Sequence, residues 1–414
     1  MDVNYKKKKF YNTAHYPIRQ PIYLSFLIWL LCKFILIGKK FKIEKVNMEG
    51  LKPPYFMLSN HMYFIDFELA AVAIWPKRIN NVVSIDGYYR RPWLMEWIGS
   101  IGTRKYTRDL HLIKSINKVL KQGDILSMYP EARYSPCGIT SYIPESLGKL
   151  IKKNEVPVVT VIHHGNHLHS PFWNFRKKRK VPMKTVVTQL LTAEQVKSMS
   201  WEEINQAILR GFQYDEYQYQ KENGILITEP FRAEGLEKVL YQCPHCKAES
   251  KMNSKGAELF CEECGKRWLL REDGNLEALN GETEFSHIPD WFRWEREQVK
   301  AQIEAGTYSF EDEVEVFSFP NCKFIPLGMA KIRHDMEEGF ILEGEYRGKP
   351  YRIQRKPIEN NSLHIEYDYC YIKPYDCFDI STEKDSFYCY PTKKNVITKL
   401  AFATELLYER ARPQ

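Results

Sequence analysis

The sequence predicts a mixed α/β protein built from an α/β domain, a small cysteine-containing module and a C-terminal, mainly-β domain. Apolar runs alternate with helix-like stretches from about residue 55 to 190, two Cys-x-x-Cys pairs lie within 243–264, and short alternating segments begin near residue 313. A chain of 414 residues is also too long for one ordinary core. We therefore expect four parts, which are an N-terminal helical segment at 1–45, the α/β domain at 46–235, the module at 240–275 and the β-rich domain at 310–414.

Composition and charge favour a globular protein that is not specialised for nucleic acid. Hydrophobic residues make up 44% of the chain and charged residues 27%. The formal net charge of +8 is modest for this length, whereas a dedicated nucleic-acid-binding protein concentrates more basic charge on one module. Basic residues gather at Lys6–Lys9, between 39 and 45, and at Arg176–Lys180, where Phe172 and Trp173 precede them. These groups flank apolar stretches, which suits an anionic membrane surface, although a solvated charge run is the alternative for the last group.

Ile22 to Gly38 is an apolar segment of seventeen residues that contains Lys33, so it is just too short for a confident membrane span. No small-residue cleavage site follows it, and its downstream flank is basic, which argues against a signal peptide. Tyr23 and Trp29 suit a membrane interface. We therefore expect a helix anchored in or on the cytoplasmic face of the cell membrane. A buried hydrophobic helix is the alternative.

The α/β domain shows its elements one after another. Apolar runs predict strands at 55–58, 81–85, 124–129, 156–163 and 184–191, and helical spacing predicts helices at 67–74, 112–120 and 146–153. Asp109 is a plausible N-cap and Gly123 a plausible C-cap of the second helix. Capping-box spacing in Thr192…Gln195 and Ser200…Glu203 predicts two more helix starts, with helix continuing to Asn223.

The C-terminal part begins with a predicted surface helix at 290–306. Short alternating segments between 313 and 390 then predict strands separated by turns, and apolar residues at helical spacing from Ile397 to Tyr408 predict a closing helix. Several strands followed by one helix resemble a pleckstrin-homology-type barrel in their order. We expect a small β-barrel or sandwich.

A His-Asp pair follows the first predicted strand, in the stretch Ser59–Asp66. Residues five apart lie about 140° apart on a regular helix, so His61 and Asp66 meet only if His61 lies in the strand-to-helix turn and Asp66 in the first helical turn. Asp66 could then accept the Nδ1–H of the imidazole and leave Nε2 as a general base. A capping aspartate beside an ordinary loop histidine is the alternative.

Three further blocks follow in order, and together with the first they carry a resemblance. They are Gly99–Lys105 (GSIGTRK), Tyr129–Ser135 (YPEARYS) and Val156–Val159 (VPVV). The succession resembles the glycerolipid acyltransferase family, in particular the 1-acylglycerol-3-phosphate O-acyltransferases, over about residues 40–190. The family pattern is N-H-x-x-x-x-D, G-x-I-x-x-x-R, F-P-E-G-T-R-S and V-P-I-x-P.

The resemblance implies a fatty acyl transfer from an acyl-carrier-protein or coenzyme A thioester to the hydroxyl of a lysophospholipid, 1-acylglycerol-3-phosphate in particular. His61 would be the base and Asp66 its orienting partner. The residues implied to bind substrate are Asn60, Arg104, Lys105, Glu131, Arg133 and Ser135. An acceptor phosphate needs cationic donors, and arginine can supply two at once.

The blocks depart from the family pattern in three places. In the third block, Arg133 comes one position early, and Tyr134 stands in the family's arginine position. In the second block, strict spacing selects Lys105 over Arg104. In the fourth block, Thr160 replaces the last proline. For Glu131 and Arg133 the alternative is a strand-end ion pair, and for Arg104 and Lys105 a solvated basic loop. The histidine-rich run at 163–169 is expected to form a pocket wall or loop rather than a metal site.

Four of the ten cysteines form the pattern C-x2-C-x14-C-x2-C, and the others show no framework spacing, which favours a reducing compartment and a metal site. The four are Cys243, Cys246, Cys261 and Cys264. Two such turns present four thiolates, so we expect a structural Zn²⁺ ribbon with no open catalytic position; iron or a redox dithiol is the alternative. Gly265 suits a knuckle with positive φ, and His245 is expected to face solvent.

Zinc ribbons can bind nucleic acid, which supplies a rival interpretation. Basic and acidic residues nearly balance over 243–273, so no electrostatic footprint for a phosphate backbone is expected. The rival protein would be non-enzymatic and would bind nucleic acid or a protein partner through the ribbon. A lipid-binding adaptor with an inactive His-Asp pair is a third interpretation.

Overall fold

The computed structural model describes residues 15–107, 109–320, 322–369 and 371–412 and divides into two compact units. The α/β unit comprises the described residues up to Thr103 together with Asp109–Asn223. The β-rich unit comprises the described residues from Gly224 onward together with the segment that begins at Arg104. The predicted basic group Lys6–Lys9 lies outside the described residues.

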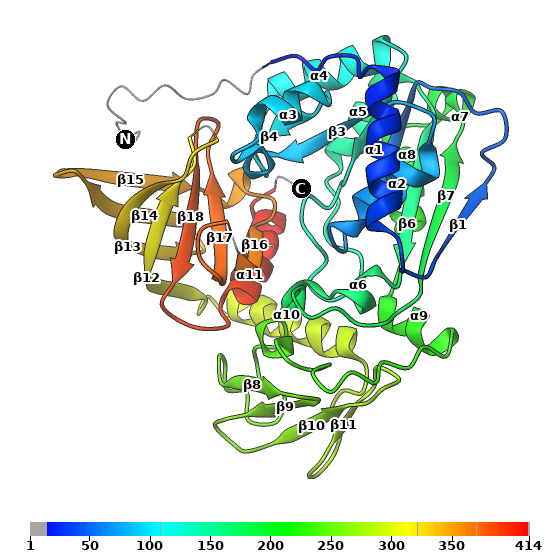
Figure 1. Ribbon diagram of the computed structural model, residues 1–414. Helices are drawn as coiled ribbons and strands as arrows, with labels where there is room; N and C mark the ends of the chain where they lie inside the picture. The colour runs from blue at the N-terminus through cyan, green and yellow to red at the C-terminus, as the bar shows by residue number, and fades with distance from the viewer. Residues whose placement is uncertain (1–14, 108, 321, 370, 413–414) are drawn as a thin grey trace. The chain divides into compact units, whose positions relative to one another are not determined.

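A seven-stranded sheet in the order β1-β7-β6-β2-β5-β3-β4 forms the centre of the α/β unit (Figure 1). Neighbouring strands run parallel, except that β6 and β7 are antiparallel. The strands are β1 (Phe41–Val46), β2 (Tyr55–Ser59), β3 (Ile79–Ser84), β4 (Ile101–Thr103), β5 (Ile125–Met128), β6 (Val158–His164) and β7 (Met183–Leu191). The helices are α1 (Ile22–Ile35), α2 (Ile65–Ile74), α3 (Pro92–Trp97), α4 (Leu110–Lys121), α5 (Ser146–Asn154), α6 (Asn166–His169), α7 (Ala193–Ser198), α8 (Trp201–Gly211) and α9 (Glu216–Glu222), with 3-10 turns at Ile85–Tyr88 and Phe172–Asn174.

Strand β2 lies in the middle of this sheet because all five of its residues are apolar or small and all are buried. Phe56 and Leu58 join a cluster with side chains of α4, α5 and α8. Tyr55 and Met57 face the other way, toward α2. Helices on both faces are the expected surroundings of a mostly parallel sheet. The carboxyl end of β2 therefore lies at the edge of a sheet that is packed against helices on both faces.

Helix α1 packs on α2 with one side and leaves the other side uncovered within this unit. Trp29 stacks on Trp75 with ring centroids 5.5 Å apart, and Leu36 packs with Ile65 and Leu69. The uncovered side carries large apolar residues that are 49–70% exposed, namely Leu27, Leu30, Leu31 and Phe34. Among the described helices, none is long and apolar enough to cross a membrane.

The local helix signals of the sequence are confirmed. Asp109 accepts a hydrogen bond from the backbone of Leu112, and Thr192 and Ser200 both form complete capping boxes. The expected continuous helix up to Asn223 is wrong. It ends at Gly211, and α9 starts afresh because Asp215 caps it by accepting from the backbone N–H groups of Tyr217 and Gln218.

The β-rich unit holds two antiparallel sheets (Figure 1). The smaller has the order β11-β10-β9-β8, and the larger β15-β14-β13-β12-β18-β17-β16. The strands are β8 (Met252–Lys255), β9 (Glu258–Cys261), β10 (Arg267–Leu270), β11 (Leu276–Ala278), β12 (Ser309–Ser318), β13 (Ile325–Asp335), β14 (Gly339–Tyr346), β15 (Lys349–Arg355), β16 (His364–Tyr369), β17 (Tyr375–Ser381) and β18 (Ser386–Pro391). The helices are α10 (Ile288–Glu304) and α11 (Ile397–Ala411), with 3-10 turns at Leu236–Lys238 and Pro357–Glu359.

The C-terminal β-rich region and its closing helix are thus present as predicted; their likeness to a pleckstrin-homology barrel stays a prediction. Helix α10 lies at the surface as expected and buries one side. Its Val299 and Ile303 are buried in a cluster with Phe402 and Leu406 of α11, and its Glu295 is fully buried, accepting from the backbone N–H of Gln242. The buried side of α10 is therefore part of the core of this unit.

Candidate active site

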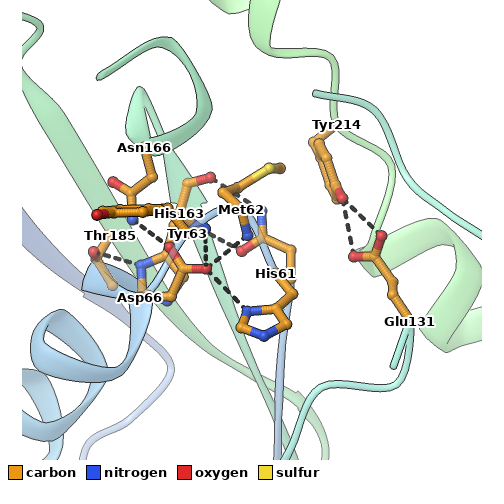
Figure 2. Close-up of polar contacts among 10 residues, drawn as sticks. His61, Met62, Tyr63, Asp66, Glu131, His163, Asn166, Thr185 and Tyr214 are labelled. Atoms are coloured by element: carbon orange, nitrogen blue, oxygen red, sulfur yellow. Dashed lines mark hydrogen bonds and ion pairs between the residues drawn. The ribbon is translucent and has the colours of Figure 1, made fainter. Parts of the chain in front are cut away.

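The structure brings His61 and Asp66 together at the carboxyl end of β2 (Figure 2). His61 lies in the turn between β2 and α2, and Asp66 in the first turn of α2. The imidazole Nδ1 is 3.2 Å from Asp66 Oδ2. The His61 side chain is 19% exposed, whereas that of Asp66 is fully buried. This is the strand-turn-helix geometry that the spacing required.

Several donors hold Asp66 in its charged form. Oδ2 accepts from the backbone N–H groups of Met62, at 2.6 Å, and Tyr63, at 2.9 Å. Oδ1 accepts from Nδ2 of Asn166 at 2.7 Å. Burial by itself raises the pKa of Asp66, but the hydrogen bonds from His61 and Asn166 and the nearby imidazoles outweigh burial and hold this pKa below its ordinary value. An ionised Asp66 fixes the tautomer of His61 with its proton on Nδ1, so Nε2 is the basic nitrogen.

The segment after β5 packs directly against this imidazole. The ring of Tyr129 stacks on His61 with centroids 3.9 Å apart, and the ring of Tyr134 lies at 4.2 Å. The backbone N–H of Ser135 donates to the carbonyl of His61 at 2.7 Å. Tyr134, which stands in the family's arginine position, therefore contributes a ring contact to the base. The first and third sequence blocks form one site.

Glu131 is buried beneath this segment. Its carboxylate accepts from the backbone N–H of Ser141 at 2.8 Å. It also accepts from the hydroxyl of Tyr214 at 2.9 Å (Figure 2). Burial raises the pKa of Glu131 to about 7, although Ser141, Tyr214 and the nearby Arg133 act in the opposite direction. Arg133 is itself only 4% exposed. Glu131 therefore ties the 129–135 segment to the chain before α9.

Two residues expected to contact substrate make hydrogen bonds to the backbone in this structure. Asn60 is fully buried, and its amide both donates to the carbonyl and accepts from the N–H of His163, which joins the ends of β2 and β6. The hydroxyl of buried Ser135 donates to the carbonyl of Ile139 at 2.6 Å. Both side chains thus help to fix the backbone around His61, and their contact with substrate stays a prediction.

Arg104 and Lys105 are the expected phosphate contacts, and their role toward substrate stays a prediction. Their segment belongs to the β-rich unit, where Arg104 donates to the carbonyl of Pro320. Lys105 acts electrostatically on the buried imidazole of His364. A short basic loop gives no sequence signal of which unit it will join, because that choice depends on tertiary packing.

The loop with Phe172 and Trp173 does not present these rings to solvent. Both are buried, and the guanidinium of buried Arg179 lies 4.9 Å from the centre of the Trp173 ring. The histidine-rich run is likewise scattered. His163 Nδ1 pairs with Thr185 Oγ1 at 2.9 Å, whereas His164 Nδ1 faces Glu216 at 3.4 Å. Asn166, which lies in the same run, contacts Asp66. The sequence did not predict a role for it.

Four cysteines form a second candidate site, in the β-rich unit. The Sγ atoms of Cys243, Cys246, Cys261 and Cys264 all lie within 4.8 Å of one another. The Cys243–Cys264 and Cys246–Cys261 pairs are 3.8 and 3.7 Å apart. Four sulfurs bound tetrahedrally to one ion at about 2.3 Å lie about 3.8 Å from each other. The cluster therefore fits a single tetrahedral metal ion.

Each Cys-x-x-Cys pair sits in a similar turn. The N–H of Lys247 donates to the carbonyl of Cys243, and that of Gly265 to the carbonyl of Cys261, both at 3.0 Å. Gly265 has φ +73°, as its place in the sequence predicted, and Lys247 has φ +65° at the matching position of the first turn. His245 is 58% exposed and faces solvent as expected. Nothing in the sequence marked Lys247, because lysine rarely adopts this conformation.

Comparisons with known proteins give one distant likeness. No protein-family model matches the chain, and no curated protein matches it. A solved structure that resembles it is the crystal structure of the 1-acyl-sn-glycerophosphate (LPA) acyltransferase, PlsC, from Thermotoga maritima, with a TM-score of 0.38 and 16% sequence identity over 46% of this chain and 77% of that one. At these values the likeness is distant, and the assignment of the site rests on its own geometry.

Proposed function

We propose that this chain is an O-acyltransferase in which His61 is the general base and Asp66 orients it. One observation carries the proposal. An imidazole that is 19% exposed has its Nδ1 3.2 Å from a fully buried carboxylate. A buried carboxylate in this position fixes the tautomer and stabilises the imidazolium that forms when the base takes a proton. The four-cysteine cluster offers its ion a closed shell, so the proposed step does not use that ion.

The proposed reaction is a direct transfer. Nε2 of His61 takes the proton of the acceptor hydroxyl, and the hydroxyl oxygen forms a bond to the carbonyl carbon of the acyl thioester. When the tetrahedral intermediate collapses, the C–S bond breaks and the thiolate leaves with the electron pair. The imidazolium returns its proton to the thiolate, so His61 is regenerated and no covalent enzyme intermediate forms.

The substrate classes of this proposal come from the sequence blocks. We assign the donor as an acyl-carrier-protein or coenzyme A thioester and the acceptor as a lysophospholipid, with 1-acylglycerol-3-phosphate as the first candidate. The stacked rings of Tyr129 and Tyr134 give the base an apolar setting that suits a fatty thioester. Arg133 is the cation of the 129–135 segment, and its neighbourhood is where we place recognition of the acceptor.

The membrane surface is part of the proposal, because such an acceptor partitions into the bilayer. The exposed side of α1 carries Leu31 and Phe34, which are 58% and 70% exposed. Lys33, Lys39 and Lys40 lie beside them in the chain. Apolar side chains flanked by lysines suit the interface of an anionic membrane. We propose that α1 lies on the cytoplasmic face of the cell membrane rather than across it.

The ribbon is proposed to hold a structural Zn²⁺. Cationic side chains around it are engaged by carboxylates, as in Arg267–Glu258 at 2.6 Å and Arg271–Glu277 at 2.7 Å. Such pairs leave less charge for a phosphate backbone, so this pattern supports a scaffold role over nucleic-acid binding.

The test is acyl transfer from a labelled thioester to a panel of lysophospholipids in vesicles, with products read by mass spectrometry. We expect His61→Ala to abolish turnover while the protein stays folded. His164→Ala is the matched control, because His164 is 23% exposed and also faces a fully buried carboxylate, that of Glu216. Unchanged turnover in His61→Ala would remove His61 from the mechanism. Absence of any product with wild-type protein, combined with salt-sensitive retention of nucleic acid, would favour the rival interpretation.

A further inference from the structure

The carboxylate of Asp66 has a second anchor beside the base. Its Oδ2 faces His61, and its Oδ1 accepts from Nδ2 of Asn166 at 2.7 Å (Figure 2). Both Asp66 and Asn166 are fully buried. They are 100 residues apart in the chain, so this bond joins the first turn of α2 to the start of α6, just after β6. It is shorter than the 3.2 Å contact between Asp66 and the imidazole.

The backbone around Asn166, at the start of α6, is held by several contacts. Gly165 has φ +79°, and a Cβ added there would lie 2.4 Å from the carbonyl oxygen of Pro182, so only glycine fits. The N–H of Gly165 donates to Oε2 of buried Glu216 at 2.6 Å. The carbonyl of Asn166 accepts from the N–H of Ser170 at 3.0 Å. These contacts fix the backbone from which the Asn166 side chain reaches Asp66.

We infer that Asn166 is a positioning residue for the His61 base, acting through Asp66. The last torsion of an aspartate side chain is broad, so a carboxylate held from one oxygen can turn. Donors on both oxygens fix its plane and aim Oδ2 at His61 Nδ1. The inference deepens the proposed function and rests on it for its kinetic consequences. Its geometric content, that Asn166 controls the state of His61, can be measured without turnover.

A carboxyl group at position 166 would affect Asp66 in a pH-dependent way, which an alanine would not. The titratable groups that act on Asp66 or respond to it are His61 in the turn, Glu68 on α2, Tyr129 after β5, His163 on β6 and Glu216 on α9. In Asn166→Asp, two carboxyl groups in contact would share one proton. While that proton is present, the new side chain donates to Asp66 Oδ1 as the amide does. When it is lost, the two groups repel each other.

The experiment compares the full-length wild-type chain with Asn166→Ala and Asn166→Asp. Asn80→Ala is the matched control, because Asn80 is also fully buried in the α/β unit and donates from Nδ2, but only to the backbone carbonyls of Gly99 and Ile18. Histidine labelled with ¹⁵N reports the His61 tautomer by NMR, with His61→Gln used to assign its signals. Acyl transfer gives kcat and KM.

We expect His61 to carry its proton on Nδ1 in the wild type and in Asn80→Ala, and to become a mixture of tautomers in Asn166→Ala. We expect kcat to fall about 10- to 100-fold in Asn166→Ala, with KM within about twofold. The kcat of Asn166→Asp should exceed that of Asn166→Ala at low pH. This difference in kcat should disappear as pH rises and the shared proton is lost. A His61 spectrum in Asn166→Ala that matches Asn80→Ala would overturn the inference. A changed spectrum in a chain without transfer activity would uphold it and refute the proposed function alone.

Discussion

Replacing Asp66 by asparagine separates the charge of this residue from its shape. Oδ2 accepts from three donors and Oδ1 from Asn166. An asparagine that places its oxygen at the Oδ2 position keeps all three donors and turns its NH₂ toward Asn166. Among the described residues, Oδ1 of Asn166 has no hydrogen-bond partner, so that amide can flip and accept from the new NH₂. The hydrogen-bond network closes again, and the free energy of unfolding should change by only about 1–2 kcal/mol.

The loss in rate should be much larger. In the transition state the imidazole becomes a cation with a carboxylate 3.2 Å away. At an effective dielectric constant of about 20, Coulomb's law gives about 5 kcal/mol for unit charges at that distance. Each 1.4 kcal/mol corresponds to about tenfold in rate, and the charge of an imidazolium is spread over its ring. We therefore expect kcat to fall about 10³-fold in Asp66→Asn.

The assay measures kcat for acyl transfer and the free energy of unfolding in urea on the same preparations. His61→Ala sets the floor of activity, and Asn80→Ala reports the effect of an unrelated buried amide. The reasoning would be refuted if folded Asp66→Asn retained more than about a tenth of the wild-type kcat. In that case the carboxylate would serve only to cap the turn, as in the alternative interpretation of the sequence.

The remaining predictions concern pH, metal and membrane. Burial raises the pKa of Glu131 from 4.5 to about 7, so this group binds more proton in the folded than in the unfolded state in that window, and its contribution to the free energy of unfolding should fall as pH rises. Because burial also raises the pKa of Glu68 to about 7, Glu131→Gln should reduce this slope without removing it in urea titrations at pH 5 and 8; an unchanged slope would refute the role of Glu131. Purified protein should contain one tetrahedral metal ion per chain by elemental analysis, and Cys261→Ser should lose it and unfold the ribbon; metal retained at wild-type stoichiometry would exclude this cluster. Phe34→Glu should weaken binding to anionic vesicles about tenfold or more, whereas Leu110→Glu, at a residue 74% exposed on α4, should not; equal effects would refute the role of α1.

The sequence was sufficient to predict those features that depend on interactions between residues close together in the chain. A threonine or serine three residues before Gln195 or Glu203 produced a complete capping box. His61 and Asp66 meet because a strand, a turn and a helix follow each other within a few residues, and each of those is encoded by neighbouring side chains. The two Cys-x-x-Cys turns are local for the same reason, since each folds around its own backbone hydrogen bonds.

Local sequence signals did not predict the contacts between segments that are distant in the chain. The sequence did not indicate that β6 would lie beside β2, which is what brings Asn166 to Asp66. It also did not indicate that Tyr214 would donate to Glu131, an interaction across 83 residues. The hydrogen bonds of Asn60 to His163 and of Ser135 to Ile139 were not indicated either, because they join backbone from other parts of the sheet and its loops.

The sequence by itself determined which residues could carry the chemistry: an imidazole, its carboxylate and four thiolates at spacings that suit a base and a metal. Tertiary structure alone decided which groups surround them. It placed Tyr129 and Asn166 around the base and gave Arg104 to the other unit. The physical reason is that hydrogen bonds and ring contacts act over a few ångströms in space, and strand order sets those distances independently of separation along the chain.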